Sequence, residues 1–277
     1  MHSRKPDWLK VRHGGYGEYV KVVKALRDGR LHTVCEEAQC PNRGECWGCG
    51  TATFMILGAT CTRNCGFCAV NSGAVGEPVD ALEPERLAAA VKRLGLKYVV
   101  ITSVDRDDLP DKGSGHYARC IRDLSDASVR VEVLIPDYSG LELESVVEVG
   151  PYVLAHNIEV VRRLQPIRDG RASYEKSLAT LEAAKVMDST LKTKSSIMLG
   201  LGETAEEVYE AMDDLLDARC DILVLGQYLQ PTKAQIQVVE YVTPERFKEY
   251  GETARKKGFR HVVSEPLART SYKAAEI

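Results

Sequence analysis

The sequence of 277 residues has few aromatic side chains, no large charge imbalance and no long hydrophobic run. Aromatic residues make up only 6% of the chain, but 44% is hydrophobic, which is enough for an ordinary globular core. A net charge of −3 gives no electrostatic reason to expect a nucleic-acid partner. Without about 20 consecutive apolar residues there is no candidate membrane span, and the N-terminus lacks the apolar run of a signal peptide. We therefore expect a cytoplasmic protein with no membrane association.

Cysteine is the residue whose distribution stands out. The chain has nine cysteines, and seven of them lie between Cys35 and Cys68. In a reducing compartment such a group is more typical of a metal site or redox chemistry than of disulfides. Cys120 and Cys220 stand alone, and we expect both to be buried, inert thiols.

Short apolar strand patterns alternate with helical patterns through most of the chain. Nearly continuous apolar strands of this kind are typical of a parallel sheet that is covered on both faces. Serial strand-helix units favour an α/β fold built as a partial parallel (β/α)6 barrel, with its chemistry at the C-terminal ends of the strands. The predicted strands are residues 51–57, 97–104, 129–136, 152–159, 191–199 and 221–229, with a weak seventh at 261–264. The predicted helices are residues 83–94, 115–124, 171–187 and 205–218, the last with a capping box at Thr204 and Glu207.

Three parts of the chain are expected from these patterns. Residues 1–50 do not fit the repeat and form an N-terminal extension, which carries one amphipathic helix at about 19–28 and the first cysteines. Residues 51–264 form the barrel. Residues 265–277 form a C-terminal tail.

The second cysteine group, Cys61-x3-Cys65-x2-Cys68, directly follows the first predicted barrel strand. Structural zinc usually takes four ligands, often from two separated pairs. Three thiolates on one short loop suit a [4Fe–4S] cluster with one iron left open, and an open position marks a reactive metal site. We therefore predict an iron–sulfur cluster here.

The first group, Cys35-x4-Cys40-x5-Cys46, is ambiguous by itself. Cys49 follows Cys46 with x2 spacing, so a zinc site or a cluster with four cysteine ligands is also compatible with the pattern. The spacing alone does not choose between these alternatives.

The Cys61–Cys68 loop resembles that of the radical S-adenosylmethionine (SAM) enzymes, which implies the radical SAM fold. The resemblance implies that SAM binds the open iron, and that an electron from the cluster cleaves it to methionine and a 5′-deoxyadenosyl radical. This radical abstracts hydrogen from an unactivated carbon. In such chemistry the cofactor reacts, and the protein supplies position and shielding.

Both cysteine groups together resemble the lipoyl synthase family. The resemblance runs from about residue 35 to residue 272 and includes CEEAQCPNRGECW, GTATFMILGATCTRNCGFCAV, TSVDRDDLPDKGSGHY, HNIE, GLGET, DILVLGQYLQPTK and PLARTSY. It implies a second, auxiliary [4Fe–4S] cluster held by Cys35, Cys40, Cys46 and a serine of an Arg-Ser-Ser-Tyr motif. In this chain that ligand maps to Ser271, and Thr270 replaces the first serine of the motif.

The resemblance also implies a reaction and partners. The family inserts two sulfur atoms from the auxiliary cluster at C6 and C8 of an octanoyl group on a carrier-protein lysine, and it uses two SAM molecules. A serine oxygen binds iron less well than a thiolate, which suits a cluster that must open. The implied partners are an octanoylated carrier, such as glycine cleavage H protein or a 2-oxoacid dehydrogenase E2 domain, a ferredoxin or flavodoxin as reductant, and an iron–sulfur carrier for cluster repair.

Several polar positions at the predicted strand ends are candidate SAM contacts. In GLGET, glycines permit close backbone approach and the following helix N-terminus favours a carboxylate. Each position also has a purely structural interpretation, as a tight turn, a solvated loop or a buried hydrogen-bonding group. The candidates are Ser103, Asp105, Asn157, Glu159, Gly200, Gly202, Glu203 and Gln227.

Two other functions remain open from the sequence. Another radical enzyme, such as a biotin-synthase-like sulfur inserter or a methylthiotransferase, would lack the C-terminal serine motif and place its second cluster elsewhere. A two-cluster electron carrier would need neither an open iron nor a barrel of this size.

Overall fold

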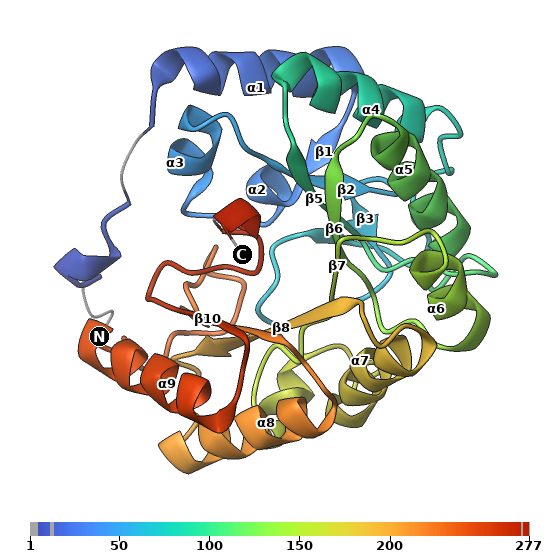
Figure 1. Cartoon of the computed structure of the whole chain (residues 1–277). Coiled ribbons are helices and arrows are strands. Elements are labelled where there is room, and N and C mark those ends of the chain that lie inside the picture. Colours follow the sequence, from blue (N-terminus) through green and yellow to red (C-terminus); the bar gives the residue numbers. More distant parts are fainter. Residues whose placement is uncertain (1–4, 12–13, 273, 277) are drawn as a thin grey trace.

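The computed structural model describes residues 5–11, 14–272 and 274–276, and its centre is a curved sheet of eight strands (Figure 1). Neighbouring strands pair in the order β1-β2-β5-β6-β7-β8-β9-β10, and all pairs are parallel except β1 with β2. The sheet begins at β1 and ends at β10, so the barrel is open, and the predicted partial barrel is confirmed. The strands are β1 (His32–Thr33), β2 (Thr53–Ile56), β5 (Tyr98–Ser103), β6 (Arg130–Leu134), β7 (Val153–Ala155), β8 (Lys192–Leu199), β9 (Ile222–Gln227) and β10 (His261–Ser264).

The six predicted barrel strands and the weak seventh are all present, but the fourth is shorter than predicted. β7 ends at Ala155, and the four residues after it lose regular strand geometry but stay beside β8, because the His156 and Glu159 N–H groups donate to the Lys194 and Ser196 carbonyls. Glu159 has a φ of 67°, a left-handed conformation that is uncommon for a residue other than glycine. The polar HNIE segment therefore forms an irregular turn that stays bonded to β8 and is not regular strand.

Six helices alternate with the strands and cover the outer face of the sheet (Figure 1). They are α4 (Glu83–Leu94), α5 (Ser114–Asp126), α6 (Gly140–Val147), α7 (Tyr174–Met187), α8 (Ala205–Asp217) and α9 (Pro244–Lys257). The capping box at the start of α8 is confirmed, because the Thr204 and Glu207 side chains each accept a hydrogen bond from the other residue's backbone N–H. The sequence patterns missed α6 and α9. α6 is only eight residues long, and α9 has a glycine, Gly251, on its buried face.

The N-terminal segment packs beside the first helices of the barrel. The predicted amphipathic helix is α1 (Tyr16–Gly29), and it contacts α4 and the short helix α3 (Arg43–Gly48). Gly14 and Gly48 bring the two backbones together, and a Cβ on Gly48 would collide with the Gly14 backbone. The remaining elements are η1 (Asp7–Leu9), α2 (Val34–Glu37), β3 (Thr60–Cys61), β4 (Asn71–Ser72), η2 (Arg162–Ile167) and η3 (Ala274–Glu276).

The C-terminal tail returns to this N-terminal segment, next to α2 and α3 (Figure 1). The Asn42 amide donates to the Leu267 carbonyl at 2.7 Å, and the Tyr272 hydroxyl donates to Glu45 at 3.0 Å. The two ends of the chain are therefore joined by direct hydrogen bonds.

The two isolated cysteines are buried in the packing between sheet and helices, as predicted. Cys120 lies on α5, and Cys220 lies two residues before β9. Burial raises the pKa of the Cys220 thiol to about 12, which keeps it protonated and unreactive. No helix in the described part of the chain has the length and apolar character needed to span a membrane.

A fully buried ion pair links β6 to β8 across β7. Lys194 Nζ lies 2.9 Å from Glu132, and the Tyr98 hydroxyl donates to the same carboxylate at 2.6 Å. Replacing Lys194 alone with methionine leaves the Glu132 charge buried and unpaired, so we expect a loss of about 3–5 kcal/mol in the free energy of unfolding. Urea denaturation followed by circular dichroism measures this loss. The double variant Glu132→Gln, Lys194→Met should recover most of it, and equal losses in both variants would contradict this account.

Candidate active site

The cysteine loop leaves the sheet through a strained backbone turn at the end of β2. Leu57 and Gly58 both have positive φ, at 69° and 91°. The Leu57 N–H donates to the buried Glu83 carboxylate at 3.0 Å, and His116 Nε2 lies 2.7 Å from the same oxygen. Arg106 donates to the Leu57 carbonyl at 3.1 Å. These buried partners hold the turn from which the cysteine loop starts, because a leucine adopts this conformation only under constraint.

The loop closes over a cavity of about 190 Å³ at the C-terminal ends of β5, β6 and β7. This is the end of the sheet at which the sequence predicts the chemistry. Of the residues predicted to act in catalysis or cofactor binding, the ones that line the cavity are Cys61, Cys65, Cys68, Ser103, Asp105, Asn157 and Glu159.

The thiols in this cavity are half-buried and receive backbone hydrogen bonds. The N–H groups of Arg63 and Asp105 point at Cys61 Sγ at 3.4 and 3.3 Å, and the Asp169 N–H points at Cys65 Sγ at 3.3 Å. Burial raises the pKa of Cys61 to about 12 and that of Cys65 to about 11. Without a metal these thiols stay protonated, so a metal bound there would have to displace their protons. The N–H groups then stabilise the sulfur charge.

A buried arginine inside the cysteine loop ties it to neighbouring strand ends. The Arg63 guanidinium lies 2.6 Å from Asp137, 2.8 Å from Asp107 and 3.5 Å from Asp105. Burial raises the pKa of Asp105 to about 6, against the opposing effect of Arg63. Arg63 and Asp137 are not among the site residues predicted from the sequence. The sequence does place an arginine, Arg63, between Cys61 and Cys65. A buried arginine needs a carboxylate partner, so this position could have indicated an ion pair at the site.

Asn157 and Glu159 face the cavity from the turn after β7. The Asn157 amide donates to Glu159 at 3.1 Å, and burial raises the pKa of Glu159. The backbone of Glu159 bridges to β8 opposite Ile197, which fixes the turn. Their neighbour His156 is buried and bonded to the Ile135 carbonyl and to Ser177, as expected of a structural histidine.

The remaining predicted SAM contacts do not line this cavity. In GLGET, the Glu203 carboxylate accepts from the N–H groups of Gly200 and Leu201 at 2.6 and 2.9 Å. The Gln227 amide bonds the Leu199, Tyr228 and Glu240 carbonyls. Gly202 has a φ of 100°, which the turn into α8 requires. A cofactor role for Gly200, Gly202, Glu203 and Gln227 remains a prediction.

The first cysteine group forms a separate site on α2, α3 and the loop between them. Cys35 is buried, Cys40 and Cys46 are partly buried, and Cys49 is exposed. Burial, reinforced by the neighbouring thiols, raises the pKa of Cys35 to about 11 and that of Cys46 to about 12. The buried indole N–H of Trp47 lies beside Cys35 and makes no hydrogen bond of normal geometry. A buried N–H group that has no partner of its own and lies beside a thiol fits a site that holds a negatively charged iron–sulfur cluster, because the N–H could donate to a cluster thiolate.

The C-terminal tail brings Arg269 and Tyr272 next to this site. Arg269 is an electrostatic neighbour of Cys40, and its guanidinium donates to the Ala268 carbonyl at 2.6 Å. Thr270 contacts Asn157 of the first cavity. Ser271 lies between Thr270 and Tyr272, whose hydroxyl is bonded to α3.

Neither cysteine group has the geometry of a site for one metal ion. In residues 5–11, 14–272 and 274–276, no three His, Cys, Asp or Glu side chains converge on one point. A cubane cluster needs a wider spacing, because each thiolate binds a different iron.

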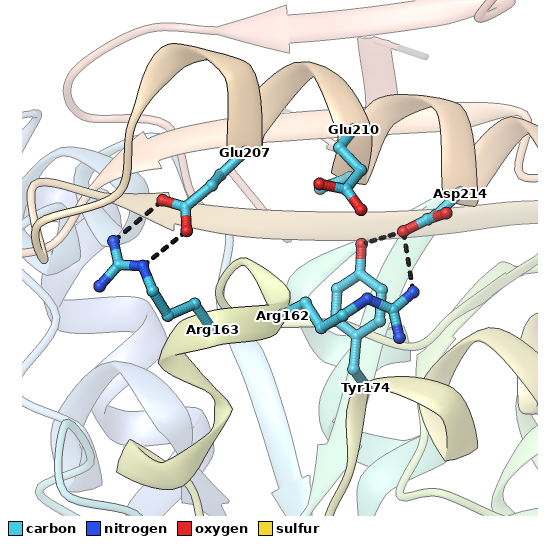
Figure 2. Close-up of a pocket in the computed structure, with 7 residues that line it drawn as sticks. Arg162, Arg163, Tyr174, Glu207, Glu210 and Asp214 are labelled. Carbon is cyan, nitrogen blue, oxygen red and sulfur yellow. Dashed lines mark hydrogen bonds and ion pairs between the residues drawn. The ribbon is translucent and has the colours of Figure 1, made fainter.

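A second cavity, of about 210 Å³, lies on the outer surface between η2, α7 and α8 (Figure 2). Arg163 bonds both oxygens of Glu207, and Asp214 accepts from Arg162 and from the Tyr174 hydroxyl. In Figure 2 the Glu207 and Asp214 carboxylates of α8 lie on one side of the cavity, and the two arginines and Tyr174 lie on the other. Exposed ion pairs of this kind each stabilise by at most about 1 kcal/mol. None of the predicted site residues lines this cavity, Glu207 having been predicted only as a cap residue of α8, and we assign the cavity no function.

Comparison with known proteins identifies relatives along the whole chain. Residues 55–215 match the Radical SAM superfamily. The lipoyl synthase of Halorhodospira halophila is 51% identical over 282 residues, which cover 100% of this chain and 84% of that protein. The lipoyl synthase of Picrophilus torridus is 54% identical over 274 residues, covering 98% and 95%. The crystal structure of methylornithine synthase has a similar fold, with a TM-score of 0.57 at 12% identity over 94% of this chain and 81% of that one.

Proposed function

Since the chain belongs to the lipoyl synthase family, within the radical SAM superfamily, we propose that it inserts sulfur at C6 and C8 of a protein-bound octanoyl group. As a superfamily member it uses SAM and a [4Fe–4S] cluster. The observation that carries the proposal is the pair of cysteine sites joined by the C-terminal tail, in which Thr270 contacts one site and Tyr272 the other. Sulfur insertion needs both a radical source and a sulfur source near one substrate.

In this proposal Cys61, Cys65 and Cys68 hold the first cluster. The backbone N–H groups directed at Cys61 and Cys65 stabilise the thiolates, and the Arg63 ion pairs keep the loop in place. Ser103, Asp105, Asn157 and Glu159 contact SAM from the strand ends; this assignment is supported by their position around the same cavity.

Cys35, Cys40, Cys46 and Ser271 hold the auxiliary cluster. When bound, the first cluster supplies the electron that cleaves SAM and the second supplies the sulfur. The Trp47 N–H and the Arg269 guanidinium are donors beside the thiols, so they compensate the negative charge of a thiolate-ligated cluster. Ser271 contributes a hard oxygen ligand, which binds iron less firmly than sulfur does.

The reaction implies partners that we also propose. The octanoyl group arrives on a lysine of a carrier such as glycine cleavage H protein or an E2 domain. Electrons come from a ferredoxin or flavodoxin, and an iron–sulfur carrier restores the consumed cluster. We place these events in the cytoplasm, where cluster thiols stay reduced.

Anaerobic reconstitution tests the proposal. We expect about eight irons per chain, four for each cubane cluster. Incubation with SAM, dithionite and an octanoylated lysine peptide should then yield 5′-deoxyadenosine and a lipoyl peptide, detected by mass spectrometry. Release of 5′-deoxyadenosine without any sulfur in the peptide would contradict sulfur insertion. A stoichiometry of about four irons would contradict the second cluster.

A further inference from the structure

The C-terminal tail is attached to the first cavity by a side-chain contact between residues far apart in sequence. The Thr270 hydroxyl lies 3.0 Å from Asn157 Nδ2, which donates to it, and 3.2 Å from Asn157 Oδ1, to which it donates. Asn157 is 8% exposed, so water competes little for this contact. A threonine hydroxyl that meets both ends of one amide fixes the position of its own backbone.

The neighbouring parts of the tail are attached elsewhere. Before Thr270, the Pro266 carbonyl accepts from the Gln227 N–H at 3.1 Å and the Leu267 carbonyl accepts from Asn42 at 2.7 Å. After it, Tyr272 donates to Glu45 at 3.0 Å. These anchors hold the tail against β9 and the N-terminal segment, and Thr270 adds the attachment to the turn after β7.

Ser271 directly follows Thr270, so the position of its side chain depends on that attachment. Adjacent Cα atoms are 3.8 Å apart across a trans peptide, and a shift of Thr270 moves Ser271 with it. The Asn157 amide also donates to Glu159 inside the first cavity. The same amide therefore contacts both the SAM cavity and the residue next to the serine ligand.

We propose that Thr270 is a positioning residue that holds Ser271 at the auxiliary cluster through its hydrogen bonds to Asn157. This inference rests on the proposed function, in which Ser271 is a cluster ligand. The Thr270 hydroxyl bonds Asn157 and no cysteine among the described residues, so in this proposal Thr270 acts through Ser271. Loss of its hydroxyl frees the serine and exposes one iron of the auxiliary cluster to solvent and chelators.

The test measures iron loss from the auxiliary cluster alone. In the full chain carrying Cys61→Ala, Cys65→Ala and Cys68→Ala, only the auxiliary cluster remains. In this background we expect Thr270→Val to increase the rate of iron transfer to an added chelator about fivefold to tenfold, as the loss of one or two hydrogen bonds predicts. Thr270→Ser keeps the hydroxyl and should restore the original rate to within about twofold.

A matched measurement separates positioning from general destabilisation. In the reciprocal background, Cys35→Ala, Cys40→Ala and Cys46→Ala, Thr270→Val should leave iron loss from the first cluster unchanged. Equal auxiliary rates for the valine and serine variants would overturn the inference, and so would equal acceleration in both backgrounds. If the first background binds no iron, the auxiliary cluster itself is contradicted, and the proposed function fails independently of Thr270.

Discussion

Replacement of Cys35, Cys40 and Cys46 with alanine is expected to reduce lipoyl formation by at least about 100-fold while SAM cleavage continues. Mutation of a group that supports a metal ligand lowers activity up to about 100-fold, and removal of the ligands themselves should lower it at least as much. The structure separates the two sites. These three cysteines lie on α2, α3 and their connecting loop, and the other triplet lines the cavity at the ends of β5 to β7. Loss of the sulfur source should therefore leave the radical source intact. Iron content and 5′-deoxyadenosine, measured on one preparation, report the two functions separately.

The reciprocal variant and an additional cysteine serve as controls. Alanine at Cys61, Cys65 and Cys68 should abolish both 5′-deoxyadenosine and lipoyl product, while about four irons remain in the auxiliary cluster. Cys49 is exposed and follows Cys46 by three residues. Cys49→Ala therefore tests whether the loss of an arbitrary cysteine from this region is enough to stop lipoyl formation. It should retain both products. Sulfur insertion by the Cys35, Cys40 and Cys46 variant at the normal rate would contradict a sulfur-donating cluster at this site.

The grouping of the cysteine loop around one cavity was predictable because its residues are local. Cys61, Cys65 and Cys68 lie within eight residues, and their spacing alone indicates three thiolates on one turn. The partners of this loop are not local. Arg63 pairs with Asp137, which is 74 positions further along the chain and follows a different strand. Such a pair depends on the order and tilt of strands that no sequence motif encodes.

The predicted SAM contacts divide in the same way. Asp105 and Asn157 each follow a parallel strand, and the carboxyl ends of neighbouring strands meet around one cavity. Glu203 has the expected position at a helix N-terminus, but its carboxylate accepts the N–H groups of its own turn. A sequence pattern indicates that a helix N-terminus favours an anion. It does not indicate whether that anion is a bound ligand or a carboxylate side chain of the same protein.

The patterns for secondary structure failed where burial departs from simple periodicity. α9 buries Phe247, Tyr250 and Ala254 together with Gly251, and the glycine weakens the helical signal. The strand predicted for 152–159 contains apolar residues throughout its first half, but its second half has the polar residues that line the cavity. There the left-handed backbone at Glu159 interrupts the regular strand.

Ser271→Cys is expected to load iron normally and to form lipoyl product at least about tenfold more slowly, because a thiolate binds iron more firmly than a serine oxygen. In the proposed assignment the change replaces the serine oxygen ligand with a soft thiolate, next to Tyr272, whose hydroxyl already fixes the tail to α3. The cluster should then resist opening, so the rate of sulfur transfer falls while the iron count stays near eight. Single-turnover formation of the lipoyl peptide measures the rate, and 5′-deoxyadenosine monitors the first cluster.

The control for an added thiol is Ser189→Cys, at an exposed position between α7 and β8 and outside both sites. It should behave as the unmodified protein in every assay. Ser271→Ala completes the series, because it removes the ligand without a substitute and should accelerate iron loss to a chelator, whereas Ser271→Cys retards it. Sulfur transfer from the cysteine variant at the unmodified rate would show that the weak oxygen ligand is not what allows the cluster to open. In that case release would have to depend on the three thiolates that both proteins share.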